Sequence, residues 1–368
     1  MIAYPKQADV LAQAVPPRQH VSCTVADLWS DFSAMVLPVT LQWSGKPFPP
    51  ADALSLVSRW LRGGMNRYSC RAVGDGFAPC ADRRDRVASC LHESGCTADR
   101  SFPLPGAAAH RSPTVIVRLP SHGQPMPVGF LALEVWLLGS RAEDEAWCPV
   151  VDNLRRLSLP RGPAARTPPV RTVSLGPARR EWFCDHANTL LRGTAHGWRL
   201  AADSPWLLRR TGSDDVEALA SDAVQRWPWH VAQRAYKFAS LLQEDRAWRA
   251  GQTVHADQAH AVCLAARSSC AEAMSGLEVH PLLAQVVQWS ERSRSTGLQQ
   301  LMVGLEFEHQ LAARTVQAGT AAAPWLAMLA WIGIGEGTAE GHGRVAIRPS
   351  EAVRRPEPPG TAPHPASP

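Results

Sequence analysis

The chain has 368 residues, 45% of them hydrophobic, and a formal net charge of +5 at pH 7. This composition excludes a wholly disordered chain and supports a buried core in one large or two ordinary domains. No apolar stretch reaches the roughly 18 residues of a membrane span, and residues 1–19 lack a signal layout, so we expect a cytoplasmic protein. Nine cysteines in such a chain favour reduced thiols or a metal site over a disulfide framework.

The first half of the chain predicts a strand followed by a helix. Residues 34–43 are rich in β-branched and aromatic side chains, which favours a strand. In residues 51–62, Leu54, Val57 and Leu61 share one helical face, and the glycines at 63–64 mark the predicted end of that helix. Two strands, a short helix and a closing strand are predicted next, at residues 113–118, 128–139, 152–157 and 170–175.

The second half predicts a long helical stretch, a strand and a final helix–strand pair. Residues 216–249 have a helical pattern with an aromatic stripe that includes Trp227 and Trp229, which we interpret as core and not as a base-stacking surface. Residues 301–311 predict a strand. An apolar helix at 324–331 leads into a glycine-rich segment and then a strand at 345–347.

Four cysteines lie in a polar stretch that has no apolar periodicity, at Cys70, Cys80, Cys90 and Cys96. Four thiolates can bind zinc tetrahedrally, and a metal would order a segment that lacks a core of its own. Their spacing is wider than in the common zinc motifs. From the residues alone, a structural zinc site and free thiols in a loop both remain open.

Five glycines fall within eleven residues after the last helix, at Gly333, Gly335, Gly337, Gly341 and Gly343. Each glycine costs backbone entropy and is best explained by positive φ or by close approach of another backbone. Amides unobstructed by side chains, followed by Arg344, suit phosphate groups. The order helix, glycines, strand is neither a P-loop nor a dinucleotide fingerprint. A glycine-rich turn without a ligand remains the alternative.

The run Gly-x-Gly-x-x-Thr-x-x-Gly-x-Gly-Arg-Val, from Gly333 through Thr338 to Val345, resembles the terminal glycine-rich loop of the CRISPR-associated repeat-RNA processing endoribonucleases of the RAMP superfamily. The Leu-Arg-Gly at 61–63 before Cys70 resembles a subgroup with a four-cysteine insertion. A basic stretch at 289–295 resembles the family segment that leads into a strand.

This resemblance implies an α+β fold of two tandem ferredoxin-like (RRM-like) RAMP modules. The implied organisation is an N-terminal arm at 1–33, a first module at 34–175 with a cysteine-rich insertion at 70–96, a second module at 176–348 with the glycine-rich loop, and a disordered tail at 349–368. Zinc in the insertion would be structural, because four cysteine ligands leave no open coordination position. No cofactor would be needed for catalysis.

The implied activity is cleavage of CRISPR repeat RNA in the precursor transcript, by metal-independent attack of a 2′-hydroxyl, to make mature guide RNA. The implied RNA-binding residues are Gly333, Gly335, Gly337, Thr338, Gly341, Gly343, Arg344, Arg292 and Arg294. We expect Gly335→Val or Gly341→Val to weaken RNA binding without unfolding the protein.

Relatives frequently place a histidine at or just after the first helix, and residues 51–67 contain none. The candidate catalytic residues are therefore Arg62, Arg67, Tyr68, His92 and His342. The alternative is a non-cleaving RAMP subunit that holds the crRNA repeat handle together with other subunits of a CRISPR effector complex. A zinc-stabilised RNA-binding protein outside CRISPR biology is a third possibility.

Overall fold

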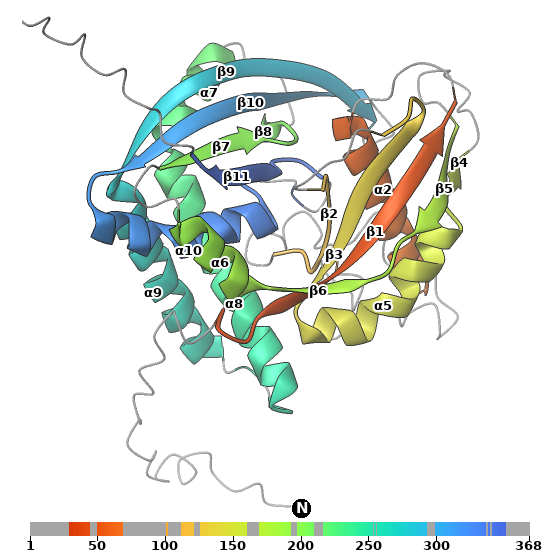
Figure 1. Cartoon of the computed structure of the whole chain (residues 1–368), viewed down its shortest axis with the longest axis horizontal. Helices are drawn as coiled ribbons and strands as arrows, with labels where there is room; N and C mark the ends of the chain where they lie inside the picture. The colour runs from red at the N-terminus through yellow and green to blue at the C-terminus, as the bar shows by residue number, and fades with distance from the viewer. Residues whose placement is uncertain are drawn as a thin grey trace, which may run out of the picture.

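A computed structural model describes residues 29–44, 50–68, 101, 112–120, 126–159, 169–192, 197–209, 216–252, 254, 256–292, 299–335, 338 and 341–350. Two antiparallel sheets with their own helices make up the two halves of the molecule (Figure 1). The cysteine-rich insertion, residues 1–28 and residues 351–368 lie outside the described part. None of the described helices has the length and apolar character that a membrane span requires.

The first sheet has the ferredoxin-like strand order. Strands β2, β3, β1 and β5 lie side by side, each antiparallel to its neighbour, and α2 and α5 connect them. The elements of this half are β1 (Ser33–Trp43), α2 (Pro50–Tyr68), β2 (Val115–Arg118), β3 (Phe130–Leu138), α5 (Ser140–Arg155), β4 (Ser158–Leu159), β5 (Val170–Leu175) and β6 (Arg179–Trp182). Strand β6 extends the sheet by pairing with the start of β1.

The second sheet repeats this order with its first strand broken into β7 and β8. Both pair with one edge of β10, β9 pairs with the other edge, and β11 lies beside β7. The elements are α6 (Phe183–Leu191), β7 (Trp198–Ala202), β8 (Trp206–Arg209), α7 (Val216–Gln225), α8 (Trp227–Arg249), α9 (Ala256–Ser275), β9 (Leu277–Arg292), β10 (Gln299–Ala313), α10 (Val316–Ile332) and β11 (Val345–Pro349). The predicted α+β fold of tandem ferredoxin-like modules is confirmed.

The first sheet is buried on both faces, which joins the two modules. In β1, Val39 and Leu41 pack with α2 and α5, whereas Ala34 and Val36 point to the opposite face, as the two-residue repeat of a strand requires. That opposite face packs against helices of the second module. Trp136 of β3 meets Trp331 of α10 in an edge-to-face contact at 5.2 Å.

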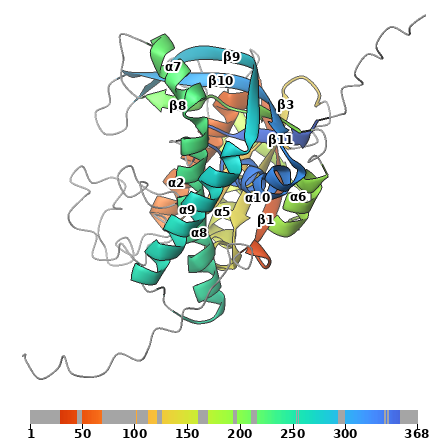
Figure 2. The same cartoon turned by 90° about the vertical axis from the view of Figure 1, so that its left-hand side faces the viewer.

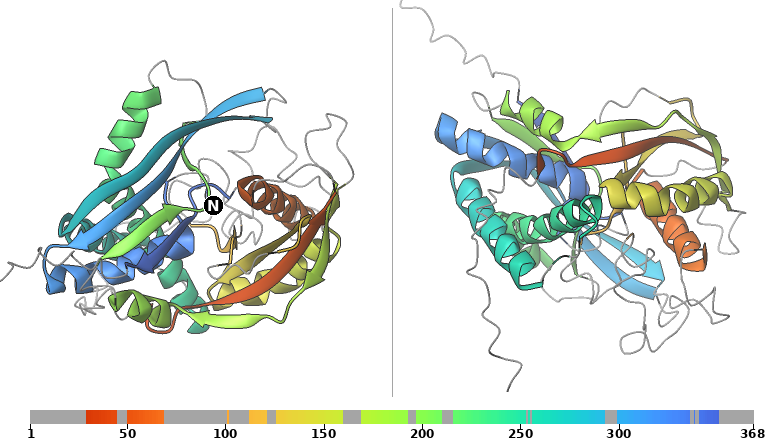
Figure 3. Two further views of the ribbon diagram at one scale, coloured as in Figure 1. Left: turned by 45° about the horizontal axis from the view of Figure 1, so that its top comes forward. Right: turned by 90° about the horizontal axis from the view of Figure 1, so that it is seen from below.

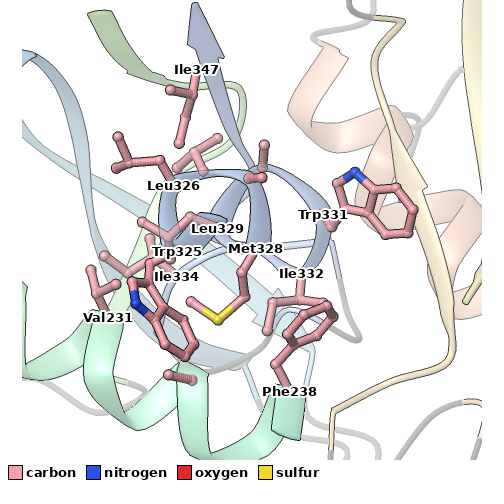
Figure 4. Packing of buried hydrophobic residues seen from close by; sticks show 14 of the residues in the cluster. Val231, Phe238, Trp325, Leu326, Met328, Leu329, Trp331, Ile332, Ile334 and Ile347 are labelled. Atoms are coloured by element: carbon pink, nitrogen blue, oxygen red, sulfur yellow. The ribbon is translucent and has the colours of Figure 1, made fainter. Parts of the chain in front are cut away.

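Helix α10 lies at the centre of this larger core. Most of its residues are buried, and the apolar side chains around it come from α8 and β11 as well as from α10 itself (Figure 4). Phe238 of α8 contacts Phe32 and Phe183 at ring distances of 5.5 and 5.1 Å. Helices α8 and α9 lie side by side below the second sheet (Figure 2). The glycine-rich segment therefore leaves a helix that is fixed on several sides.

A carboxylate of the second module caps a helix of the first. Helix α5 begins after Gly139, which has no side chain to cap it, and Asp245 of α8 accepts a hydrogen bond from the amide of Arg141 at 3.2 Å. Burial raises the pKa of Asp245, and the Arg141 amide and the nearby Arg249 act in the opposite direction. A Cβ at Gly139 would lie 2.6 Å from Asp245 Oδ1. This contact fixes the modules relative to each other.

Helices α2 and α5 are longer than the sequence predicts, α10 begins at Val316 and not at 324, and the predicted helix at 216–249 is divided into α7 and α8. Helix α2 continues through Gly63 and Gly64 to Tyr68. A Cβ at Gly64 would lie 1.9 Å from the Asn153 side chain, so this glycine lets α2 approach α5 closely and does not end the helix. Helix α5 begins at Ser140, well before the predicted start at 152, and includes Pro149.

Candidate nucleic-acid interface

The glycine-rich segment connects α10 to β11, as the sequence predicts. Its described residues are 333–335, 338 and 341–344. Positive φ angles occur at Gly333, Gly335, Gly341 and Gly343, with values of 75°, 73°, 89° and 62°. L-residues with side chains rarely adopt this conformation, so the expected conformational role of these four glycines is confirmed. Gly337 lies outside the described residues.

The groups that approach these glycines closely belong to the protein itself. A Cβ at Gly335 would lie 2.0 Å from Nε1 of Trp206 in β8. A Cβ at Gly341 would lie 3.0 Å from the backbone carbonyl carbon of Leu54 in α2. The segment therefore packs against both modules, and close packing explains these glycines without a bound phosphate.

Arg234 of α8 holds the start of the segment from inside the protein. Its guanidinium donates to the carbonyl oxygens of Ile332 at 2.7 Å and Gly333 at 3.1 Å, and to Oγ1 of Thr338 at 3.2 Å. Burial lowers the pKa of Arg234 to about 10, so the side chain stays protonated at neutral pH. A planar charged fork suits this task because it serves several acceptors at fixed angles.

Arg344 holds the end of the segment in the same way. Its guanidinium donates to the carbonyl oxygens of Ile332, at 3.2 Å, and of Thr338. Its backbone amide donates to Oγ of Ser204 at 2.9 Å, and that hydroxyl donates to the carbonyl of Gly341 at 2.7 Å. The sequence predicts a phosphate contact for Arg344, but its side chain is 2% exposed and donates to the protein's own carbonyls. In this structure Arg344 shapes the segment from within.

A third buried arginine gives the junction of the modules a positive charge. The guanidinium of Arg118 in β2 lies 4.6 Å from the ring centre of Trp136, and its Nη1 has no hydrogen-bond partner in the described structure. Burial lowers the pKa of Arg344 well below its ordinary value, and the charges of Arg118 and Arg234 lower it further, while Asp203 opposes them. Burial raises the pKa of Asp203 despite the arginines around it. Buried cations thus outnumber carboxylates beside the segment.

The structure separates the predicted catalytic residues into two groups. His342, which is 4% exposed, follows Gly341 and so lies where the segment meets Leu54. Arg62, which is 9% exposed, is eight residues further along α2, or about 12 Å along the helix axis. By the same measure Tyr68 is about 21 Å from Leu54. The first helix therefore meets the glycine-rich segment in its first half, and Arg62, Arg67 and Tyr68 follow further along the same helix.

Several other predicted site residues are placed only in part. The backbones of Arg67 and Tyr68 form the last turn of α2, and Arg292 ends β9, but the structure does not describe their side chains. The free end of the β9–β10 hairpin extends toward the side of the molecule on which α2 lies (Figures 1 and 3). Outside the described residues are His92, Arg294, Cys70, Cys80, Cys90 and Cys96.

Sequence reasoning missed the residues that build the segment from a distance. Arg234 and Ser204 come from other elements and have no local motif around them. The sequence contains only weak indications that these arginines are buried. Arg118 follows the apolar run 115–117, and Arg234 lies among small and aromatic residues of a helix.

The packing predicts the effect of a valine at Gly341. We expect Gly341→Val to lower the free energy of unfolding by about 2–4 kcal/mol, because positive φ strains an L-residue and the added atoms press on the α2 backbone. The variant is thus expected to remain folded but with reduced stability. Gly63→Ala is the control, since nothing lies within 4 Å of its Cβ and alanine favours a helix interior. Urea denaturation that finds Gly341→Val as stable as wild type would contradict the packing.

Comparisons with known proteins give a likeness of fold at low identity. No protein-family model matches the chain, and no curated protein does. Among solved structures, a Cas6 product complex is 12% identical with a TM-score of 0.43 and covers 85% of this chain and 98% of its own. Thermus thermophilus Cas6 is 12% identical, with a TM-score of 0.40 and coverage of 86% and 98%. A Cas6-related protein from Pyrococcus furiosus is 9% identical, with a TM-score of 0.37 and coverage of 86% and 100%. The fold assignment rests on the strand order of the two sheets.

Proposed function

We propose that this protein binds the repeat RNA of a CRISPR precursor transcript and cleaves it without a metal ion to give mature guide RNA. The observation that carries the proposal is the Gly-x-Gly-x-x-Thr-x-x-Gly-x-Gly-Arg-Val segment between the last helix and last strand of the second ferredoxin-like module. Its packing on α2 supports the proposal, because it brings the segment to the junction of the two modules.

The proposed RNA surface includes Gly335, which is partly exposed while the other described residues of the segment are buried. It also includes Arg292, the last residue of β9, and Arg294, two positions later in the sequence. Phosphate contacts provide most of the affinity of such surfaces and make binding depend on salt. Gly333, Gly341, Gly343, Thr338 and Arg344 would then act by holding the conformation of the segment. Gly337 remains a proposed direct contact.

Cleavage by a 2′-hydroxyl requires a base for that hydroxyl, a cation for the phosphoryl oxygens and an acid for the leaving oxygen. Arg62 and Arg67 are proposed as the cations, because arginine stays protonated at neutral pH and for the same reason is a poor base. Tyr68 is proposed to orient the phosphate or supply a proton, since an unperturbed tyrosine is mostly protonated at neutral pH. His92 and His342 are the proposed bases.

A second candidate is a non-cleaving subunit that holds the repeat handle among other subunits of a CRISPR effector. Two observations favour it. The chain has no histidine in residues 51–67, and His342 is only 4% exposed. Both candidates require recognition of repeat RNA, so they share one surface and differ only in chemistry.

The shared requirement is tested by affinity. Repeat RNA from a CRISPR array should bind at least about tenfold more tightly than a scrambled RNA of equal length, because a specific site adds base contacts to the salt-dependent phosphate contacts. Fluorescence anisotropy at two salt concentrations measures both the base-specific part of the affinity and the salt-dependent phosphate part. Equal affinities at both concentrations would reject the two candidates together.

We further propose a structural zinc ion on Cys70, Cys80, Cys90 and Cys96. Support comes from the donor set, because four thiolates complete a tetrahedral zinc site and leave no position for catalysis. Among the described residues no group of three or more metal-binding side chains occurs. Elemental analysis of protein purified without chelator should find about one zinc per chain, and Cys80→Ser with Cys90→Ser should lose it. Metal-free wild-type protein would reject the site.

A further inference from the structure

An exposed tryptophan lies in the first turn of α8. Trp227 is buried, but Trp229, two residues later, has an exposed fraction of 57%. Trp182 and Trp248, the other exposed tryptophans among the described residues, reach 42% and 40%. Trp248 already has partners, because Arg141 lies 4.8 Å from its ring centre and Asp144 accepts its Nε1 hydrogen at 3.2 Å. A tryptophan left as exposed as Trp229 is typical of a binding surface.

Two aromatic rings, His230 and Trp206, connect Trp229 to the glycine-rich segment. The ring of Trp229 meets His230 edge to face at 4.9 Å, and His230 meets Trp206 in the same way at 4.7 Å. Trp206 is the side chain that lies against Gly335. Because the Trp229–His230 contact is edge to face, an exposed Trp229 ring can still stack with a further ring. Trp229 is therefore linked to the segment by side-chain contacts that pass through the buried Trp206.

The surroundings of Trp229 favour a nucleotide over an apolar protein surface. Its neighbours along the helix at three and four positions include Arg226 and Gln233, which are polar. The Arg226 side chain is largely exposed and pairs with Asp222 at 2.7 Å. A flat aromatic face beside an arginine matches a base with its phosphate, because the base stacks and the cation attracts the phosphate. An apolar protein partner would need a contiguous apolar patch.

We infer that Trp229 is a stacking platform for one unpaired base of the bound RNA, on a surface outside the glycine-rich motif. This inference rests on the proposed function, since it takes the same RNA as the ligand. The base stacks on the open face of the indole, and Arg226 faces the adjoining phosphate. The site recognises an unpaired nucleotide, because a base within a duplex has no free face to offer.

The test compares Trp229→Ala, Trp229→Phe and the control Trp248→Ala. Each is titrated by anisotropy with single-stranded repeat RNA and with the same RNA paired to its full complement. We expect Trp229→Ala to bind the single strand roughly tenfold more weakly, Trp229→Phe to stay within about threefold of wild type, and Trp248→Ala to be unchanged. Affinity for the duplex should not change in any variant.

The outcomes separate this inference from the proposed function. If wild type prefers repeat RNA over scrambled RNA and Trp229→Ala binds it as tightly, the stacking platform is wrong and the proposed function stands. An equal loss on single strand and duplex would also overturn the inference, because it would show a contact that needs no free base. Failure of wild type to bind either RNA would reject both.

Discussion

Replacing Arg234 with alanine is expected to lower the free energy of unfolding by about 3 kcal/mol or more. The guanidinium donates to two backbone carbonyls and one hydroxyl in the interior, and its removal leaves these acceptors buried without their donor. Hydrogen bonds from a charged donor each contribute about 1.5–3 kcal/mol, and an unsatisfied buried group adds its own desolvation cost. We expect Arg234→Ala to be among the most destabilising single changes in the second module.

Two variants make this measurement specific. Arg234→Lys keeps the charge but not the planar fork, so it should recover only part of the loss. Arg226→Ala removes an exposed arginine of the same chain region and should change stability by no more than about 0.5 kcal/mol. Urea denaturation of the four proteins gives the comparison. If Arg234→Ala and Arg226→Ala have equal small effects, the buried fork does not hold the segment.

Single-turnover cleavage should slow by on the order of a hundredfold when the residue nearest the scissile phosphate is changed, with affinity kept. The candidates come from two elements: Arg62, Arg67 and Tyr68 lie in the second half of α2, and His342 lies in the glycine-rich segment. We expect the loss in Arg62→Ala, Arg67→Ala or Tyr68→Phe, since these residues supply the proposed cations and proton.

The histidine variants are the counterpart of this test. His342→Ala should change the free energy of unfolding more than the cleavage rate. His92→Ala tests whether a residue of the cysteine-rich stretch takes part in cleavage. A hundredfold loss in His342→Ala alone, at unchanged stability, would move the site to the segment itself. Wild-type rates in all five variants would remove both assignments.

Elements with strong local patterns could be predicted from the sequence. The sequence predicts strands at residues 170–175 and 301–311, which correspond to β5 and β10. The first is rich in β-branched residues, and the second alternates apolar and polar side chains from Leu305 to Glu308. Strand β7 and helix α9 were not predicted. The five residues of β7 are mixed in polarity, and its place beside β10 depends on pairing with residues more than a hundred positions away. Helix α9 is rich in alanine and serine and has only a weak apolar stripe.

The candidate site shows the same division between local and distant information. Clustered glycines predict positive φ because that requirement is local to the backbone. Their contacts are not local, since Arg234 is 99 residues from Gly333 and Ser204 is 140 residues from Arg344. The aromatic stripe of α8 was interpreted as core, which is right for Trp227 and wrong for Trp229. Helical spacing alone does not predict which face of the first turn of α8 is covered by the rest of the second module.

The most direct measurement of the central claim is a gel analysis of repeat RNA incubated with the protein in excess EDTA, with the chemical ends of the products determined. Attack by the 2′-hydroxyl leaves a 2′,3′-cyclic phosphate on one product and a 5′-hydroxyl on the other. The account predicts cleavage at one position in the repeat, with these ends and without metal, and no cleavage of scrambled RNA. Intact RNA, or products with 5′-phosphate ends that appear only when a divalent metal is added, would contradict it.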